Sequence, residues 1–74
     1  MEHEEIRKAF HEVYNNFYLK YRDKGMAKTD EEWEKIIESA NEIICSFQKS
    51  DLVRHMVNDL IYEIEISDKK YKNQ

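Results

Sequence analysis

The chain has 74 residues, with 12 lysines and arginines against 16 aspartates and glutamates, a net charge of −4, one glycine, one cysteine and no proline. This length suits one domain with a small core, and the negative total argues against a protein built mainly to neutralise nucleic-acid phosphates. Because glycine and proline, the usual residues of turns, are almost absent, the composition predicts an all-α chain. We expect a three-helix antiparallel bundle.

The sequence shows no sign of targeting to a membrane. No cationic start followed by an apolar run marks a signal peptide, and no apolar stretch approaches the ~20 residues needed to cross a bilayer. Cys45 is the only cysteine, which excludes an internal disulfide and fits a reducing compartment. We therefore expect a cytoplasmic protein with no membrane partner.

The first predicted helix covers residues 3 to 24. Its apolar residues recur at intervals of three and four, which places them on one face at ~100° per residue. Gly25 is placed to end this helix as a Schellman motif, with Met26 against Tyr21. Tyr14 and Tyr18 lie beside the apolar stripe, where a tyrosine can bury its ring and keep its hydroxyl wet, so we predict that they bind a partner. The stripe consists of Ile6, Phe10, Val13, Phe17 and Tyr21.

The second predicted helix starts at Asp30, because Thr29 and Glu32 form a capping-box pattern, and it extends to about residue 47. Its apolar stripe consists of Trp33, Ile36, Ile37, Ala40, Ile43, Ile44 and Phe47. The carboxylates lie on other faces of the same helix and would form a contiguous acidic surface for a protein partner. The predicted acidic residues are Asp30, Glu31, Glu34, Glu38 and Glu42.

The third predicted helix covers residues 51 to 66, with Ser50 or Asp51 as N-cap. A continuous helix through both segments would leave their stripes roughly 140° out of phase, so we expect a break at residues 48–50. Residues 67–74 are polar and are predicted to form a frayed tail beyond the 1–66 helical domain. The stripe consists of Leu52, Val53, Met56, Val57, Leu60, Ile61 and Ile64.

The third stripe is wide, and a minimal three-helix bundle would leave part of it uncovered. A homodimer or a groove on a larger protein would cover it. The core itself should draw on all three stripes. Its predicted members are Phe10, Val13, Phe17, Trp33, Ile36, Ala40, Ile44, Val53, Val57, Leu60 and Ile64.

Residues that could catalyse a reaction or bind a metal ion are scattered. Asp51, His55 and Asp59 share one helix face, but two or three ligands on one helix do not make a closed metal site, so we interpret them as a solvated face. No sequence feature places a histidine beside Cys45 as a nucleophile pair. A glycine-rich phosphate loop and a nucleophile elbow are also missing. We predict no enzymatic activity, no metal and no cofactor.

Direct binding of nucleic acid is an alternative interpretation of the first helix. Lys20, Arg22 and Lys24 accompany its tyrosines, and exposed rings beside cations can stack on bases. The neighbouring acidic residues and the negative total charge weaken this interpretation. A small DNA-binding transcriptional regulator therefore stays the alternative, and it would need a basic face and a helix able to enter the major groove.

Two runs, "FYLKYRDKGMAKTDEEWEKIIESANEII" and "DLVRHMVNDLIYEIE", cover most of the chain. They resemble small uncharacterised helical proteins carried by phages and conjugative elements of anaerobic bacteria. Small acidic proteins of such elements often bind host machinery, and they include inhibitors of nucleic-acid-guided nucleases, such as anti-CRISPR proteins, whose carboxylates occupy a basic groove. The resemblance implies a non-enzymatic interaction module that binds a host protein, a partner protein or itself.

Overall fold

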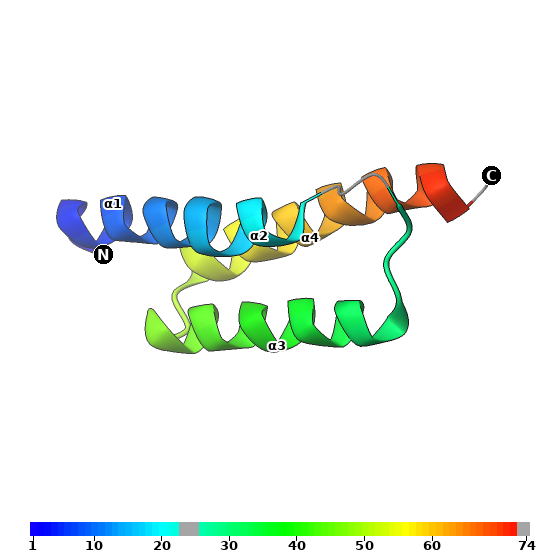
Figure 1. Ribbon diagram of the computed structural model, residues 1–74. Helices are drawn as coiled ribbons and strands as arrows, with labels where there is room; N and C mark the ends of the chain where they lie inside the picture. The colour runs from blue at the N-terminus through cyan, green and yellow to red at the C-terminus, as the bar shows by residue number, and fades with distance from the viewer. Residues whose placement is uncertain (23–25, 73–74) are drawn as a thin grey trace.

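The computed structural model describes residues 1–22 and 26–72 of the chain. Over these residues no strand is present, so the protein is all-α, as its composition predicts. The first three elements follow one another without a gap and form one rod, which we call the first helix (Figure 1). In chain order the elements are α1 (His3–His11), η1 (Glu12–Tyr18), α2 (Leu19–Tyr21), α3 (Asp30–Ser46) and α4 (Asp51–Lys72).

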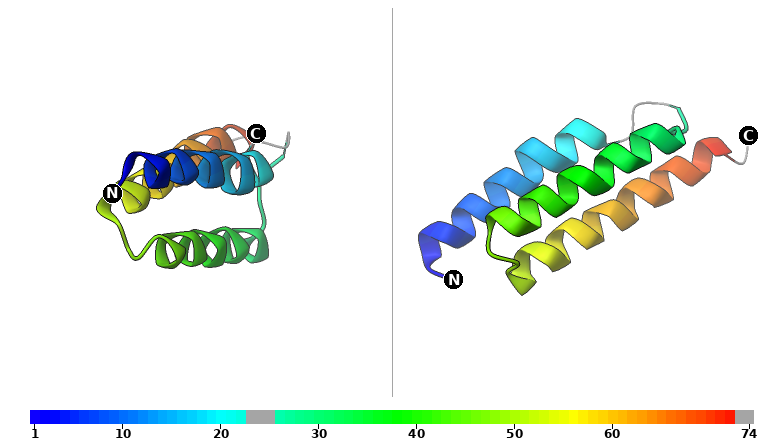
Figure 2. Two further views of the ribbon diagram at one scale, coloured as in Figure 1. Left: turned by 90° about the vertical axis from the view of Figure 1, so that its left-hand side faces the viewer. Right: turned by 90° about the horizontal axis from the view of Figure 1, so that it is seen from below.

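The helices lie side by side along the long direction of the molecule, which measures 45 × 18 × 16 Å along its principal axes. The first helix and α4 run in the same direction, and α3 runs in the opposite one (Figure 1). Seen from below, α3 lies in front of the space between the other two helices, and seen end-on it lies to one side of them (Figure 2). α3 therefore covers one side of this pair, and no helix of the described chain covers the other side.

The core lies where the three helices meet, and all three supply it. Its buried apolar side chains are Ala9, Val13, Phe17, Ile36, Ala40, Val53, Val57 and Ile64. Except for Ala9, all of these are core residues that the sequence predicts. Trp33, Ile44 and Leu60 are partly buried and pack against them. Burying a side chain the size of Phe17 or Ile36 contributes about 1.5–3 kcal/mol, so this small set supplies much of the stability.

Phe10 is a predicted core residue that the structure contradicts. Its side chain is 55% exposed, whereas the neighbouring Ala9 is fully buried. The stripe that faces the core recurs every four residues and consists of Ala9, Val13, Phe17 and the half-buried Tyr21. In an unbroken α-helix a step of four residues overshoots a full turn by about 40°, so this stripe would drift by about 120° along its length.

The π-helical turns of η1 explain why the stripe stays on one face. The backbone N–H of Leu19 donates to the carbonyl of Tyr14, five residues earlier, where an α-helix would use the residue four positions earlier. A π-helix is wider and turns through a smaller angle per residue, so residues four apart lie closer to alignment. The predicted stripe assumed a uniform α-helix and therefore included Phe10.

The first helix ends at Tyr21, before the predicted residue 24, because the ψ angle of Arg22 is already extended, at 175°. The predicted Schellman ending at Gly25 lies outside the described residues. Met26, expected to contact Tyr21, is 68% exposed. A hydrogen bond of 2.7 Å between the hydroxyl of Tyr21 and Oγ of Ser39 instead ties the end of the first helix to α3.

α3 begins at Asp30, as the capping pattern predicts. Oγ1 of Thr29 accepts a hydrogen bond from the backbone N–H of Glu32 at 3.2 Å. In return, Oε1 of Glu32 accepts one from the backbone N–H of Thr29 at 3.3 Å. The capping box satisfies two backbone donors that a helix start would otherwise leave unpaired, and it fixes where the helix begins.

α3 ends at Ser46, one residue before the predicted end, and the predicted break at residues 48–50 is confirmed. The N–H of Lys49 donates to the carbonyl of Ile44 at 2.9 Å, and the N–H of Gln48 donates to that of Cys45 at 3.1 Å. These two bonds form a Schellman motif. Gln48 and Lys49 both have a φ of 57°, a left-handed conformation that costs about 1–2 kcal/mol for a residue other than glycine.

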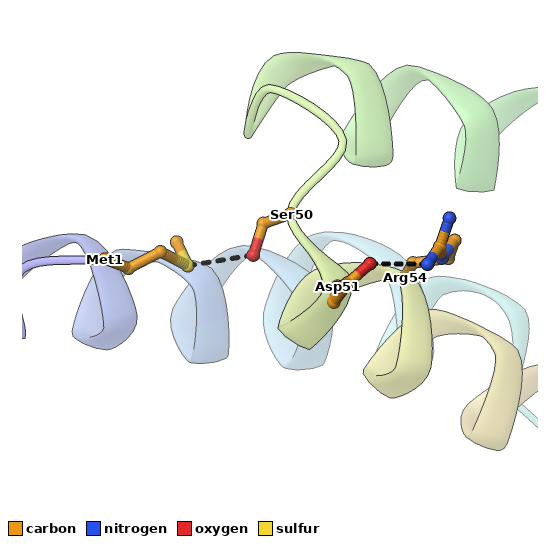
Figure 3. Close-up of polar contacts among 4 residues, drawn as sticks. All are labelled: Met1, Ser50, Asp51 and Arg54. Atoms are coloured by element: carbon orange, nitrogen blue, oxygen red, sulfur yellow. Dashed lines mark hydrogen bonds and ion pairs between the residues drawn. The ribbon is translucent and has the colours of Figure 1, made fainter.

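Ser50 is the N-cap of α4, because its carbonyl accepts the first helical hydrogen bond, from the N–H of Arg54 at 3.0 Å. Figure 3 shows that the Ser50 hydroxyl donates to the sulfur of Met1, at 3.0 Å, and that the carboxylate of Asp51 pairs with Arg54. Asp51 also lies at the positive end of the helix dipole, where a negative charge is favourable. The amino-terminal residue is thus tied to the turn between α3 and α4.

The end of α4 contradicts the predicted frayed tail. The helix continues to Lys72, six residues past the predicted end, so the described part of residues 67–74 is helical. Asp68 is only 2% exposed, and its Oδ1 accepts a hydrogen bond from the backbone N–H of Lys28 at 2.7 Å. Asp68 therefore holds the connection between the first helix and α3 against α4.

Candidate functional site

α3 carries the negative charge of the protein. Its sequence contains six carboxylates and one lysine, which gives a net charge of −5. The whole chain has a net charge of −4, so the remainder of the chain carries +1. This concentration on one helix separates the protein into an acidic part and a nearly neutral part.

Five of these carboxylates form one surface, which we call the α3 acidic face. At ~100° per residue they fall within an arc of about 120° on the side of α3 opposite the buried Ile36. Among the described residues, ion pairs join Arg7 to Glu4 and Arg54 to Asp51, and none involves a carboxylate of this face. All five side chains of the face are exposed: Asp30, Glu31, Glu34, Glu38 and Glu42.

An apolar depression of about 570 Å³ adjoins the α3 acidic face. Trp33, which is partly buried, and Ile37, which is 46% exposed, line it together with three carboxylates of the face. Apolar side chains surrounded by charged ones are typical of a surface that binds another protein. The depression gives this face a contact area besides its charge.

A second surface lies between the first helix and α4, and we call it the aromatic groove. Its volume is about 300 Å³. Phe10 is 55% exposed and Tyr14 is 53% exposed. The ring of Tyr14 stacks on that of Tyr18, with centroids 5.8 Å apart, which extends the aromatic surface along η1. The groove is lined by Phe10, Val13, Tyr14, Met56, Asp59 and Leu60.

The structure separates the predicted partner-binding residues into two groups. Tyr14 and Tyr18 belong to the first helix and adjoin the aromatic groove, to which α3 contributes no lining residue. Glu31, Glu34, Glu38 and Glu42 lie on α3. The groove itself was not predicted, because Phe10 and Leu60 were assigned to the core. In the first helix, apolar residues recur every four positions from Ala9 to Tyr21. This spacing is the sequence signal that could have predicted an exposed Phe10.

Of the cations considered for nucleic-acid binding, Lys20 and Arg22 lie at the end of the first helix. Nζ of Lys20 lies 5.3 Å from the centre of the Tyr21 ring, in a cation–π contact. Tyr21 also packs edge-on against Phe17, with ring centroids 5.6 Å apart. Arg22 is exposed, and Lys24 lies outside the described residues.

The residues considered for catalysis or metal binding are exposed. Asp51 pairs with Arg54, while His55 and Asp59 are exposed on α4. Within residues 1–22 and 26–72, no group of three or more histidine, cysteine, aspartate or glutamate side chains is arranged to hold a metal ion. Cys45 is exposed with a free thiol.

A further depression, of about 660 Å³, lies between the first helix and the end of α3. Arg7, Lys8 and His11 are among the residues that line it, and such side chains could bind an anion. However, Arg7 already pairs with Glu4 at 2.7 Å. The last carbonyls of α3 also bring the negative end of its dipole to this position, which opposes an anion.

Comparisons with protein-family models, with curated proteins and with solved structures gave no match to this chain. In the described ranges, no helix combines the length and the apolar character that crossing a bilayer requires. The α3 acidic face and the aromatic groove are therefore the features on which a function can be based.

Proposed function

We propose that this protein acts by binding another protein, without turnover, and that the α3 acidic face is the surface that binds. The observation that carries the proposal is the net charge of −5 on α3 beside a depression lined by Trp33 and Ile37. The exposed carboxylates attract a basic surface at long range, and the apolar side chains pack against it after contact. The binding unit is an antiparallel three-helix bundle, either alone or as a homodimer.

The partner that fits this surface is a protein with clustered arginines and lysines, such as a nucleic-acid-binding enzyme. Carboxylates spaced along a helix can occupy a groove that normally holds phosphates, so the bound protein would act as an inhibitor. The resemblance to proteins of phages and conjugative elements supports a host enzyme as the target. Binding should weaken as salt rises, because exposed charges are screened.

The proposal is tested by affinity capture from the native host, followed by mass spectrometry. The test variant is Glu34→Lys with Glu38→Lys, and the matched control is Glu63→Lys with Glu65→Lys, which makes the same change of charge at exposed positions of α4. The wild type and the control should capture the same basic protein, and the test variant should lose it. Association rates measured against salt should show a flatter dependence for the test variant than for the control. Equal capture by both variants would contradict the proposal.

A DNA-binding regulator is the competing outcome of the same experiment. It would bind duplex DNA tightly at physiological salt, lose that binding when Lys20 and Arg22 are replaced, and capture no protein. The net charge of +1 outside α3 is small for such a role. A mobility-shift assay with these variants distinguishes the two functions.

A further inference from the structure

We infer that a second copy of this chain occupies the aromatic groove, so that two copies pair through their first helices and α4 helices. The groove and the α3 acidic face are different surfaces, because no residue of α3 lines the groove. The inference therefore does not depend on the proposed function. Three observations support this occupant: the exposed rings beside the groove, the distribution of charge around it and the accessible area of the whole chain.

Exposed aromatic rings and the groove that they line lie together on this surface, an arrangement that suits pairing with a second copy. Phe10 and Tyr14 line the groove together with Met56 and Leu60. Both aromatic side chains are more than half exposed. A ridge beside a groove can pair with itself under two-fold symmetry, because the ridge of each copy enters the groove of the other. The aromatic rings then supply the large, rigid contacts that are enriched at the centres of protein interfaces.

The charge distribution favours pairing through this surface. Among the residues that line the groove, only Asp59 is charged, and it is exposed. Each copy has a net charge of −4, and α3 alone carries −5. α3 covers the other side of the pair formed by the first helix and α4 (Figure 2). Contact through the groove therefore keeps the two acidic α3 helices away from the interface.

The accessible area of the protein is large enough for such a contact. The chain exposes 5539 Å². A folded monomer of 9.1 kDa exposes about 4,900 Å² by the usual scaling with mass. The surplus of roughly 600 Å² is three quarters of the ~800 Å² that each partner buries in an interface of standard size.

The test is the molar mass of the full chain in solution, measured by light scattering and sedimentation equilibrium across a range of concentrations. The wild type should have twice the chain mass of 9.1 kDa. Phe10→Glu and Tyr14→Ser should raise the dimer dissociation constant by roughly tenfold or more, since each removes a central aromatic contact. Both sites are more than half exposed, so helix content by circular dichroism should not change. The matched control is Tyr62→Ser, at a 60% exposed tyrosine of α4 that does not line the groove.

The outcomes separate clearly. A dimer that survives Tyr62→Ser and is lost in Phe10→Glu and Tyr14→Ser supports the inference. A monomer at every concentration up to the millimolar range overturns it, and so does a dimer that tolerates both groove variants or is weakened equally by the control. The Glu34→Lys, Glu38→Lys variant should remain dimeric whether or not it captures a partner, which keeps this test apart from that of the proposed function.

Discussion

α3 and the first helix arrange their side chains in contrasting ways. α3 buries Ile36 and Ala40 and presents carboxylates to solvent, as expected for an amphipathic helix. The first helix buries Ala9, a small side chain, and leaves the larger Phe10 half exposed. The comparison shows that two helices of one small bundle can carry different kinds of surface, one suited to long-range attraction and the other to close packing.

The largest expected effect comes from deleting one residue of α3. Deletion of Asn41 from α3 would rotate the partly buried Ile43, Ile44 and Phe47 by about 100° and remove them from contact with the core. We expect the free energy of unfolding to fall by about 4 kcal/mol, because complete burial of each side chain would contribute about 1.5–3 kcal/mol and each of the three is buried in part. Urea unfolding followed by circular dichroism measures it.

The matched deletion in the first helix is Asn15. Removing it changes the spacing of the buried stripe from four, four and four to four, three and four, which suits a plain α-helix. The free energy of unfolding should fall by only about 1 kcal/mol, which is the net contribution of one hydrogen bond. The bond that is lost joins Nδ2 of Asn15 to the carbonyl of His11, at 3.1 Å. Equal destabilisation by the two deletions would show that the π-helical turns do not set the register.

A second pair of variants compares the two phenylalanines of the first helix. Phe17→Ala should cost about 3–5 kcal/mol, because it opens a cavity in the core. Phe10→Ala should cost less than about 1 kcal/mol, because its side chain is already 55% exposed. Thermal melts at low protein concentration, where the chain is monomeric, measure both. Similar losses would mean that Phe10 belongs to the core after all.

The connection between the first helix and α3 is tested at Asp68 of α4, which binds it. Asp68→Ala leaves the buried N–H of Lys28 without this acceptor, and we expect a loss of about 1–3 kcal/mol. Asp68→Asn keeps an oxygen acceptor and should cost less. Lys69→Ala, at an exposed neighbouring position, serves as the control. Chemical denaturation should rank the three variants in that order of loss, and an equal loss for Asp68→Ala and the control would argue against the bond.

The smallest effect is a gain at the end of α3. Gln48→Gly relieves a left-handed conformation that glycine adopts freely, and we expect a stabilisation of about 0.5–1 kcal/mol after the greater flexibility of the unfolded chain is subtracted. The control is Ser46→Gly, at the last residue of α3, which should have the opposite sign because glycine is less favourable than serine in a helix. A melting temperature that falls in both variants would contradict the assignment of strain.

Local signals were enough to predict α3 and the break that follows it. The capping box places its start, and the change of phase between the second and third stripes places the break. The Schellman motif at Gln48 could not be foreseen, because the sequence has no glycine there. The left-handed turn is instead formed by Gln48 and Lys49.

The first helix and the end of α4 were predicted less well, for physical reasons. A helical period of 3.6 residues was assumed for the whole first helix, so its π-helical segment and the exposure of Phe10 were missed. Asp68 follows the buried Ile64 by four residues, but a carboxylate on a core row suggests a solvated tail unless its partner is known. That partner, the N–H of Lys28, lies 40 residues away in the chain. The five carboxylates of the α3 acidic face are exposed as expected, and their role in binding stays a prediction.

The bond between Asp68 and Lys28 also has a consequence for the order of folding. Closing a loop of 40 residues costs roughly 3 kcal/mol in chain entropy, and this one bond does not offset that cost. The contact therefore forms only after α3 and α4 have brought its two ends together. In a hydrogen-exchange experiment, the amide of Lys28 and those of the last turns of α4 should open as one unit, at a lower free energy than the amides around Val57.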